Sequence, residues 1–402
     1  MKRLLLVGWL LGLALLNATE PGGRWVATWA TSQQLTEKNN LPPEPGFTEA
    51  TVRQKLRVSI GGEKLRVRFS NEFGNGPLAL EATHVALADG FDDAKIQPGT
   101  SRALTFRGMA SVTIQPGATV ISDPVDLPLA PMADVAITTV TKASPSDVTS
   151  HPGSRTTSYF AYGGAAPDPA DLPGAKRTDH WYFMCSLDVW TTRPAAAVAI
   201  LGDSITDGRG SIHNQNNRWP DILSQRLRAN PGTADVAVLN HGVGGGRVLR
   251  DGLGVSALRR FDRDIIAQPG VKWLIILEGV NDLGTSSPET VAQTAQELIS
   301  AYDQMITRAH DQGIKVYGAT IMPLGGFKGY DTPEREAARQ AVNAWIRTSG
   351  RFDAVIDFDA VARDPETPSK LSAATDGGDH LHLSADGYRI IAESIDLGLF
   401  VR

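Results

Sequence analysis

The sequence predicts an α/β fold in two regions: an antiparallel β-sandwich over residues 24–190, followed by a parallel sheet with helices over residues 196–402. Two observations predict this division. Short strands with alternating apolar and polar residues, interrupted often by Pro and Gly, fill the first half. Strands alternate with helical stretches in the second half, which is typical of a parallel sheet covered by helices on both faces. A chain of 402 residues is also long for one domain.

The first 18 residues are expected to be a signal peptide rather than part of the fold. Residues 1–3 give a short basic start, residues 4–16 form a nearly unbroken apolar run, and Asn17 and Ala18 follow as its exit. This order is typical of a secretory signal that is cleaved after export. An uncleaved anchor is the alternative, although the apolar run is short for a membrane span. We therefore expect a secreted or periplasmic protein without stable membrane insertion after cleavage.

Composition and charge argue against several classes of function. The formal net charge is −5 and no block of Lys or Arg stands out, so nucleic acid is a poor candidate partner. The single cysteine, Cys185, cannot form an internal disulfide and lies in an apolar alternating stretch, which predicts a buried strand thiol. Neither a His-Glu-x-x-His pattern nor paired cysteines occur, so the sequence predicts no metal and no other cofactor.

The first half shows its strands most clearly around two adjacent glycines. Apolar residues fall on one parity over residues 52–60 and alternate again over 65–69. Gly61 and Gly62 lie between these stretches, which predicts a β-hairpin. Further short strands are expected at residues 82–87, 111–114, 135–140 and 183–189. A jelly-roll-like antiparallel sandwich is the expected architecture.

The second half alternates between the two element types. Strands are expected at residues 198–201, 236–239, 273–277, 316–321 and 355–358. Helices are expected at residues 219–229, 332–348 and 385–399, together with one long helix. That long helix should open at a Ser-x-x-Glu capping pattern, residues 286–289, and end at Gly313.

Polar or glycine-rich clusters follow the first three of these strands, and another precedes the last helix. The clusters are Gly202–Ser204, Asn240–Val248, Glu278–Asp282 and Asp376–Tyr388. Sheets of this kind bind ligands beyond the carboxyl ends of their strands. We therefore expect the four clusters to meet at one edge of the sheet.

These clusters hold the residue types that acyl transfer needs. The hydroxyl of Ser204 becomes a good nucleophile only when a base takes its proton, and histidine is the usual base. Asp379 and His382 are three residues apart, so the carboxylate can fix the ring while the ring faces the serine. Donors for a developing oxyanion are available from the Ser204 amide, an amide in the loop Gly244–Gly246 and the Asn281 side chain.

The four clusters resemble the four sequence blocks of the SGNH, or GDSL, hydrolase superfamily. The blocks are "GDSITDG" from Gly202, "NHGVGG" from Asn240, "GVND" from Gly279 and "DHLH" from Asp379. The resemblance covers residues 196–402 and implies a flavodoxin-like three-layer αβα fold without a metal. It also implies catalytic roles for three residues and oxyanion-hole roles for three donors. These are Ser204, Asp379 and His382 for catalysis, and Ser204, Gly245 and Asn281 for the oxyanion hole.

Several assignments stay open at this point. His380 competes with His382 as the base, but the spacing to Asp379 favours His382. Asp376 is an alternative orienting acid.

Other polar residues near the blocks have plainer explanations. Asp203 and Asp282 are expected to be structural hydrogen-bonding groups, and Asp207 is expected to be a loop residue. His241, beside the glycine loop, is a further candidate for substrate contact.

The sequence therefore predicts a secreted serine esterase that acts through an acyl-enzyme. A small-molecule or polysaccharide ester is the expected substrate, with O-acetylated carbohydrate preferred because some bacterial carbohydrate esterases carry a similar sandwich. The alternative substrates are short-chain, aryl or lipid esters. An alternative of another class is a metal-dependent phosphoesterase, with Asp203, Asn281, Asp379 and His382 as ligands.

Overall fold

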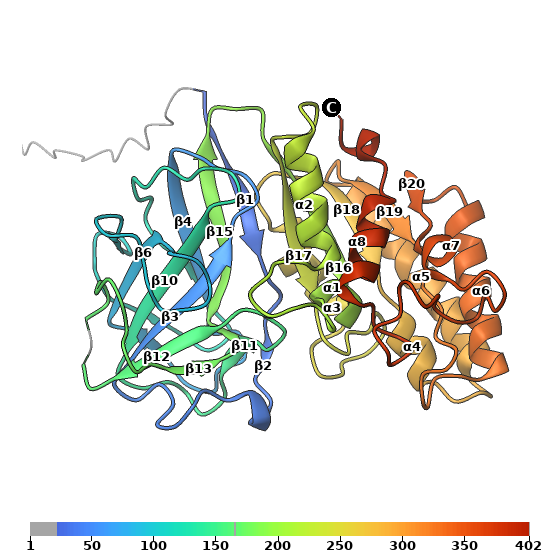
Figure 1. Cartoon of the computed structure of the whole chain (residues 1–402), viewed down its shortest axis with the longest axis horizontal. Coiled ribbons are helices and arrows are strands. Elements are labelled where there is room, and N and C mark those ends of the chain that lie inside the picture. Colours follow the sequence, from blue (N-terminus) through green and yellow to red (C-terminus); the bar gives the residue numbers. More distant parts are fainter. Residues whose placement is uncertain (1–21, 165, 402) are drawn as a thin grey trace, which may run out of the picture.

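Antiparallel sheets form the first half of the chain and a parallel sheet with helices forms the second, as Figure 1 shows. The structure is a computed structural model that describes residues 22–164 and 166–401. The expected signal peptide, residues 1–18, lies outside the described residues. Within the described part, no helix has the length and apolar character needed to cross a membrane.

Fifteen strands build the antiparallel region in the part of the chain that the structure describes. They are β1 (Arg24–Ala30), β2 (Gln34–Leu35), β3 (Ala50–Arg57), β4 (Lys64–Ser70), β5 (Leu78–Leu80), β6 (Ala82–Leu87), β7 (Arg102–Leu104), β8 (Val112–Ile114), β9 (Thr119–Ile121), β10 (Asp134–Thr141), β11 (Thr149–His151), β12 (Ser158–Tyr162), β13 (Lys176–Thr178), β14 (Trp181–Tyr182) and β15 (Met184–Thr191). A short 3₁₀ helix, η1 (Lys38–Asn40), follows β2.

Two large sheets pack their apolar faces together and make the sandwich. One has the order β1-β15-β4-β9 and the other the order β13-β12-β3-β10-β6-β7. Val67 and Leu187 from the first sheet share one buried cluster with Leu56 and Ile137 from the second. Two small sheets, β14-β11-β2 and β5-β8, complete this region. The predicted antiparallel sandwich is therefore confirmed.

The hairpin predicted at Gly61–Gly62 is wrong. Strand β3 pairs with β10 and β12, whereas β4 pairs with β15 and β9, so the chain crosses from one sheet to the other at these glycines. A Cβ on Gly61 would lie 2.0 Å from the backbone oxygen of Leu129. The glycine is needed because another backbone segment approaches it closely, and not because of a tight hairpin turn.

Five strands form the parallel sheet of the second half. They are β16 (Ala196–Gly202), β17 (Val236–Gly242), β18 (Val271–Leu277), β19 (Lys315–Ala319) and β20 (Ala354–Ile356). Their order is β17-β16-β18-β19-β20, and every pairing is parallel. Numbered along the chain, this is the 2-1-3-4-5 order of flavodoxin-like folds. The direction of winding changes between β16 and β18, which is where such sheets place their ligands.

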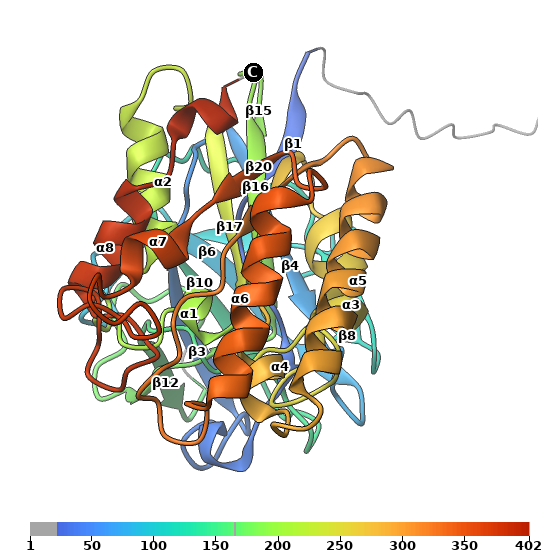
Figure 2. The same cartoon turned by 90° about the vertical axis from the view of Figure 1, so that its right-hand side faces the viewer.

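Helices cover both faces of this sheet, so the three-layer prediction is confirmed. The helices are α1 (Ser204–Asp207), α2 (Trp219–Ala229), α3 (Ala257–Phe261), α4 (Val280–Thr285), α5 (Val291–His310), α6 (Pro333–Thr348), α7 (Phe358–Ala362) and α8 (Ala385–Glu393), with a π-helical turn η2 (Asp262–Ile266) and a 3₁₀ helix η3 (Leu397–Phe400). Figure 2 shows α2, α7 and α8 on one face and α3, α5 and α6 on the other.

Helix boundaries agree with the sequence where a cap or a proline marks them. Helix α2 spans residues 219–229 as predicted, and Thr332 caps α6 through its hydroxyl. The expected start of the long helix at residues 286–289 is wrong, because residues 287–290 form a turn in which the Thr290 N–H donates to the Ser287 carbonyl. Helix α5 therefore begins at Val291.

The sandwich packs directly on the edge strand of the parallel sheet. Strand β1 lies along β17, and the hydroxyl of Ser59 is 3.1 Å from the Val238 nitrogen and 3.0 Å from the Val238 oxygen. This contact occupies polar groups that an edge strand would otherwise expose. The antiparallel strands end at Thr191 and the parallel sheet begins at Ala196, yet the buried apolar side chains of both regions form one cluster. The division into two domains stays a prediction.

Candidate active site

The turn after β16 presents a serine at the carboxyl edge of the sheet. Ser204 is the first residue of α1, and the Asp203 carboxylate caps this helix by accepting the Ile205 N–H at 2.9 Å. A Cβ on Gly202 would lie 2.2 Å from the hydroxyl of Thr206, so only glycine allows the chain to turn this sharply. The strand therefore delivers the Ser204 side chain to the position where such sheets bind ligands.

Three side chains form a hydrogen-bonded row at this edge. Ser204 Oγ lies 2.8 Å from His382 Nε2, and His382 Nδ1 lies 2.7 Å from Asp379 Oδ2. The other oxygen of Asp379 accepts the backbone N–H groups of Leu381 and His382 at 3.0 and 2.8 Å. Ser204 and His382 are 6% and 8% exposed, so a small reagent can reach a pair that is otherwise shielded from solvent. The structure thus brings together the three residues that the sequence singled out.

The competing histidine lies in a separate pair. His380 Nδ1 is 2.6 Å from Asp376 Oδ2, and the His380 side chain is 56% exposed. The His382 ring, by contrast, packs edge-on against Phe327 with ring centroids 6.4 Å apart. Of the two histidines, the structure places His382 beside Ser204.

The surroundings of His382 keep its ring neutral near pH 7. Burial lowers the pKa of His382 below 6.5, and although Asp379 raises it, the nearby charges of Arg209 and Arg155 lower it further. Burial also raises the pKa of Asp379, but hydrogen bonds from the His382 amide and ring outweigh that effect, so the pKa is lowered overall. A neutral imidazole beside a serine and an ionised carboxylate are the states that base catalysis requires.

These shifts predict the acid limb of the pH–activity profile. Only neutral His382 can accept the Ser204 proton, so kcat/KM should rise with pH as His382 loses its proton. Because the pKa is lowered, the midpoint of this rise should lie below pH 6.5. Initial rates on an uncharged acetyl ester between pH 4 and 9 measure it. A midpoint above pH 6.5 would contradict the proposed environment of His382.

The expected oxyanion donors come from three different segments. Gly245 lies in the loop after β17 with φ of 67°, a left-handed conformation that favours glycine. The Asn281 side chain, at the start of α4, donates from Nδ2 to the Gly246 carbonyl at 2.9 Å. A Cβ on Gly246 would meet Asp203 Cα at 3.4 Å, so this loop lies against the turn that carries Ser204.

Tyr330 fixes the orientation of the Asn281 amide. Its hydroxyl donates to Asn281 Oδ1 at 3.0 Å, which leaves Nδ2 as the group beside Gly246. The Tyr330 ring fits here because Gly284 has no side chain, since a Cβ on Gly284 would lie 2.1 Å from the ring. Nothing in the sequence points to Tyr330, because 49 residues separate it from Asn281 and no motif links the two.

This arrangement predicts graded effects of two substitutions. Asn281→Ala should lower kcat by about 10²–10³-fold, the usual loss on removal of one oxyanion donor, with little change in KM. Tyr330→Phe should lower kcat only about fivefold, because it removes one hydrogen bond worth roughly 1 kcal/mol and leaves the amide in place. Steady-state kinetics of both variants test the order of the effects, and a larger loss from Tyr330→Phe would contradict the assignment.

Comparison with known families identifies this region. The family model of GDSL-like lipases and acylhydrolases matches residues 200–390. Residues 200–390 form a GDSL-like lipase/acylhydrolase domain. The protein is accordingly a carboxylic ester hydrolase.

Solved structures similar to the GDSL domain include three hydrolases. A GDSL-like lipase from Bacteroides thetaiotaomicron VPI-5482 has 17% identity and a TM-score of 0.35, over 49% of this chain and 84% of that chain. A lipase/acylhydrolase from Enterococcus faecalis has 21% identity and a TM-score of 0.37, over 50% and 92%. The acetyl xylan esterase AlAXEase has 20% identity and a TM-score of 0.38, over 49% and 96%. No relative was found among curated proteins.

The other acidic residues of the GDSL blocks have structural roles. Asp203 caps α1, and Asp282 accepts the backbone N–H groups of Val248 and Leu249 at 2.9 and 3.0 Å. Burial, assisted by the charge of Asp282, raises the pKa of Asp203 to about 7. Both carboxylates therefore shape the loops around Ser204, as the sequence suggested.

Two polar residues of the GDSL domain, Asp207 and His241, contact the sandwich, and for Asp207 the predicted loop position is wrong. Asp207 is not a loop residue but ends α1, where its Oδ1 lies 3.0 Å from His151 Nε2. His241 is buried, its Nδ1 lies 3.3 Å from Ser32 Oγ, and burial lowers its pKa to about 4. Neither contact could be foreseen, because both partners belong to the sandwich.

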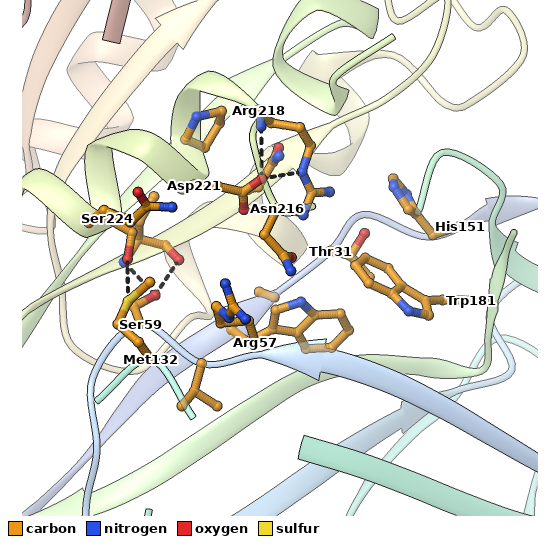
Figure 3. Close-up of a pocket in the computed structure, with 17 residues that line it drawn as sticks. Thr31, Arg57, Ser59, Met132, His151, Trp181, Asn216, Arg218, Asp221 and Ser224 are labelled. Atoms are coloured by element: carbon orange, nitrogen blue, oxygen red, sulfur yellow. Dashed lines mark hydrogen bonds and ion pairs between the residues drawn. The ribbon is translucent and has the colours of Figure 1, made fainter. Parts of the chain in front are cut away.

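A small cavity lies between the sandwich and the GDSL domain. Figure 3 shows its lining, with Arg57, His151 and Trp181 from the sandwich and Asn216 and Arg218 from the GDSL domain. Its volume is about 40 Å³. Since one water needs roughly 10–15 Å³ of such space, the cavity has room for a few waters but not for a sugar ring. A substrate must therefore bind outside it.

Proposed function

We propose that Ser204 is the nucleophile of a serine esterase, with His382 as its base and Asp379 as the orienting carboxylate. The observation that carries this proposal is the row of hydrogen bonds from Ser204 Oγ to His382 and on to Asp379. As Ser204 attacks the ester carbonyl, His382 takes the hydroxyl proton and then gives it to the leaving alcohol. Water, activated by the same ring, hydrolyses the acyl-enzyme.

Three donors are proposed to stabilise the oxyanion that forms in both steps. They are the backbone amides of Ser204 and Gly245 and the Nδ2 group of Asn281. The Ser204 and Gly245 amides have no hydrogen bond to another described residue, so they are available to a ligand. Donors fixed in place before the reaction stabilise the charge without reorganisation.

The proposed substrate is an O-acetylated carbohydrate. Polar groups lie near His382 in the chain or act on it electrostatically: the exposed His380, its partly buried partner Asp376, the partly exposed Asp379 and the exposed Arg209. A rim of this kind suits a hydroxyl-rich alcohol part better than a long apolar chain. Short-chain, aryl or lipid esters are the second candidate substrates. We further propose that residues 1–18 direct export to the periplasm or the medium.

A release assay tests the substrate class. The enzyme is incubated with acetylated xylan, acetylated pectin and p-nitrophenyl esters of increasing chain length, and released acid is measured. Acetate should be released from a polysaccharide, and activity on aryl esters should fall as the acyl chain lengthens. Release of long acyl chains alone would contradict the carbohydrate proposal.

Inhibitors separate this chemistry from a metal-dependent phosphoesterase. Over residues 22–164 and 166–401, no group of three or more His, Cys, Asp or Glu side chains is placed to hold a metal ion. Asp203, one of the ligands considered, instead accepts a backbone N–H group. A serine-directed organophosphate should abolish activity and modify Ser204, while EDTA should leave activity unchanged. The opposite pattern would favour the phosphoesterase.

A further inference from the structure

Two arginines without partners stand beside the proposed active site. Arg209 follows α1, where its backbone N–H donates to the Ser204 carbonyl at 2.9 Å. Its own carbonyl accepts the Tyr388 hydroxyl at 2.6 Å. The backbone of Arg209 is therefore held within a few residues of the serine, while its side chain is exposed.

Arg155 reaches the same place from the sandwich. Its loop packs on α1 so closely that a Cβ on Gly153 would lie 1.9 Å from Asp207 Oδ2. The Arg155 carbonyl accepts the Asn214 N–H at 2.9 Å, and its φ of 51° lies in the left-handed region that non-glycine residues rarely adopt. The surrounding contacts thus impose a strained backbone on this residue, a feature that gathers at ligand sites.

The guanidinium groups of Arg209 and Arg155 both influence the pKa of His382. The charges of Arg209 and Arg155 each lower the pKa of His382, which places both groups within electrostatic reach of a ring that lies 2.8 Å from Ser204. Arg155 also lowers the pKa of Tyr388, whose hydroxyl contacts Arg209. Both arginines therefore act on groups packed around Ser204, and the backbone contacts of Arg209 and of the Arg155 loop fix where their side chains start.

Neither guanidinium group forms a hydrogen bond or ion pair with any residue in the described part of the chain. Arg155 Nε is buried without a partner. The Nε of the buried Arg260 also lacks a partner, but Arg260 and Arg339 each bind two carboxylates through their terminal nitrogens, whereas Arg155 binds no described carboxylate. Buried polar groups without partners are rare in native proteins and call for an explanation such as an absent ligand.

We propose that Arg155 and Arg209 bind an oxyanion group of the substrate, a carboxylate or a sulfate, next to the ester that Ser204 attacks. This inference rests on the proposed function and narrows its substrate class to acidic esters, such as O-acetylated carbohydrates with uronate or sulfate groups. Guanidinium groups match such anions in geometry and charge. The sandwich then supplies one of the two groups that select the substrate.

The test compares esters that differ in one charge. The probes are 4-acetoxybenzoate, 4-acetoxybenzenesulfonate and the neutral methyl 4-acetoxybenzoate, and the variants are Arg155→Gln, Arg209→Gln and the double variant. The quantity measured is the ratio of kcat/KM for each anionic ester to that for the neutral ester. Loss of either charge also raises the pKa of His382, but this effect acts on all esters and cancels in the ratio.

Each single substitution should lower the ratio about tenfold for at least one anionic ester, as expected on loss of a charge-assisted hydrogen bond. The anionic ester whose kcat/KM ratio falls more identifies the preferred oxyanion. The control variant Arg102→Gln, at an exposed arginine that bonds only to nearby backbone oxygens, should leave the ratio unchanged. Ratios within twofold of wild type in the double variant would overturn this inference alone. A wild-type enzyme that hydrolyses none of the esters would overturn the proposed function as well.

Discussion

Ser204→Ala should lower kcat on acetyl esters by on the order of 10⁶-fold, the scale of loss when a serine hydrolase loses its nucleophile. The Oγ atom is the group that would form the covalent bond to the acyl carbon, and it lies 2.8 Å from His382 Nε2. The oxyanion donors stay in place, so a residual acceleration of about 10³–10⁴-fold over water should remain. Steady-state rates measure the loss of activity. Mass spectrometry after treatment with an organophosphate measures the loss of the adduct.

A serine elsewhere on the GDSL domain provides the control. Ser300 is exposed on α5, where its hydroxyl donates to the Gln296 carbonyl, and Ser300→Ala should retain wild-type kinetics and the adduct at Ser204. Equal melting temperatures of Ser204→Ala and Ser300→Ala would show that a folding defect does not cause the loss of activity. Wild-type turnover by Ser204→Ala would refute the assignment of the nucleophile.

Asp379→Asn should lower kcat by about 10⁴-fold, because an amide no longer holds His382 in the tautomer that accepts the serine proton. The carboxylate lies 2.7 Å from His382 Nδ1 and also accepts two backbone N–H groups of the same turn. Loss of its charge should lower the pKa of His382 further, since Asp379 raises that pKa. Rates over a range of pH separate the change in kcat from the change in pKa.

The pair of Asp376 and His380 offers a matched control for this prediction. It has the same residue types and a comparable distance of 2.6 Å, but its histidine is exposed. Asp376→Asn and His380→Gln should change kcat only a few-fold, since neither side chain forms a hydrogen bond with Ser204 or His382. A loss from Asp376→Asn as large as that from Asp379→Asn would reverse the choice between the two acids.

The parallel sheet was predictable because its signals are local. Each of its strands is a short apolar run between polar or glycine-rich stretches, and the capping hydroxyl of Thr332 marks the start of α6. The order of the motifs along the chain also placed Ser204, Asp379 and His382 at one edge of the sheet. The expected start of α5 was wrong, because residues 287–290 form a turn that leads into the helix, which begins at Val291.

Contacts between distant segments were not predictable in the same way. Gly61 has the local signature of a hairpin, and only the approach of Leu129 from another part of the chain explains the glycine. Asp207 and His151 are 56 residues apart, and neither sits in a pattern that points to the other. A single sequence indicates which residue types are present, but the burial that pairs them depends on the assembled fold.

The interface along β17 bears on whether the esterase half can exist alone. A chain beginning at Ala195 would lose the Ser59 contacts that occupy Val238 and the His151 contact that holds the end of α1. Its bare strand edge would be open to pairing with other chains, a common route to aggregation. The sandwich is thus no detachable accessory module. Deletion or replacement of the sandwich would expose the edge strand β17 and the end of α1.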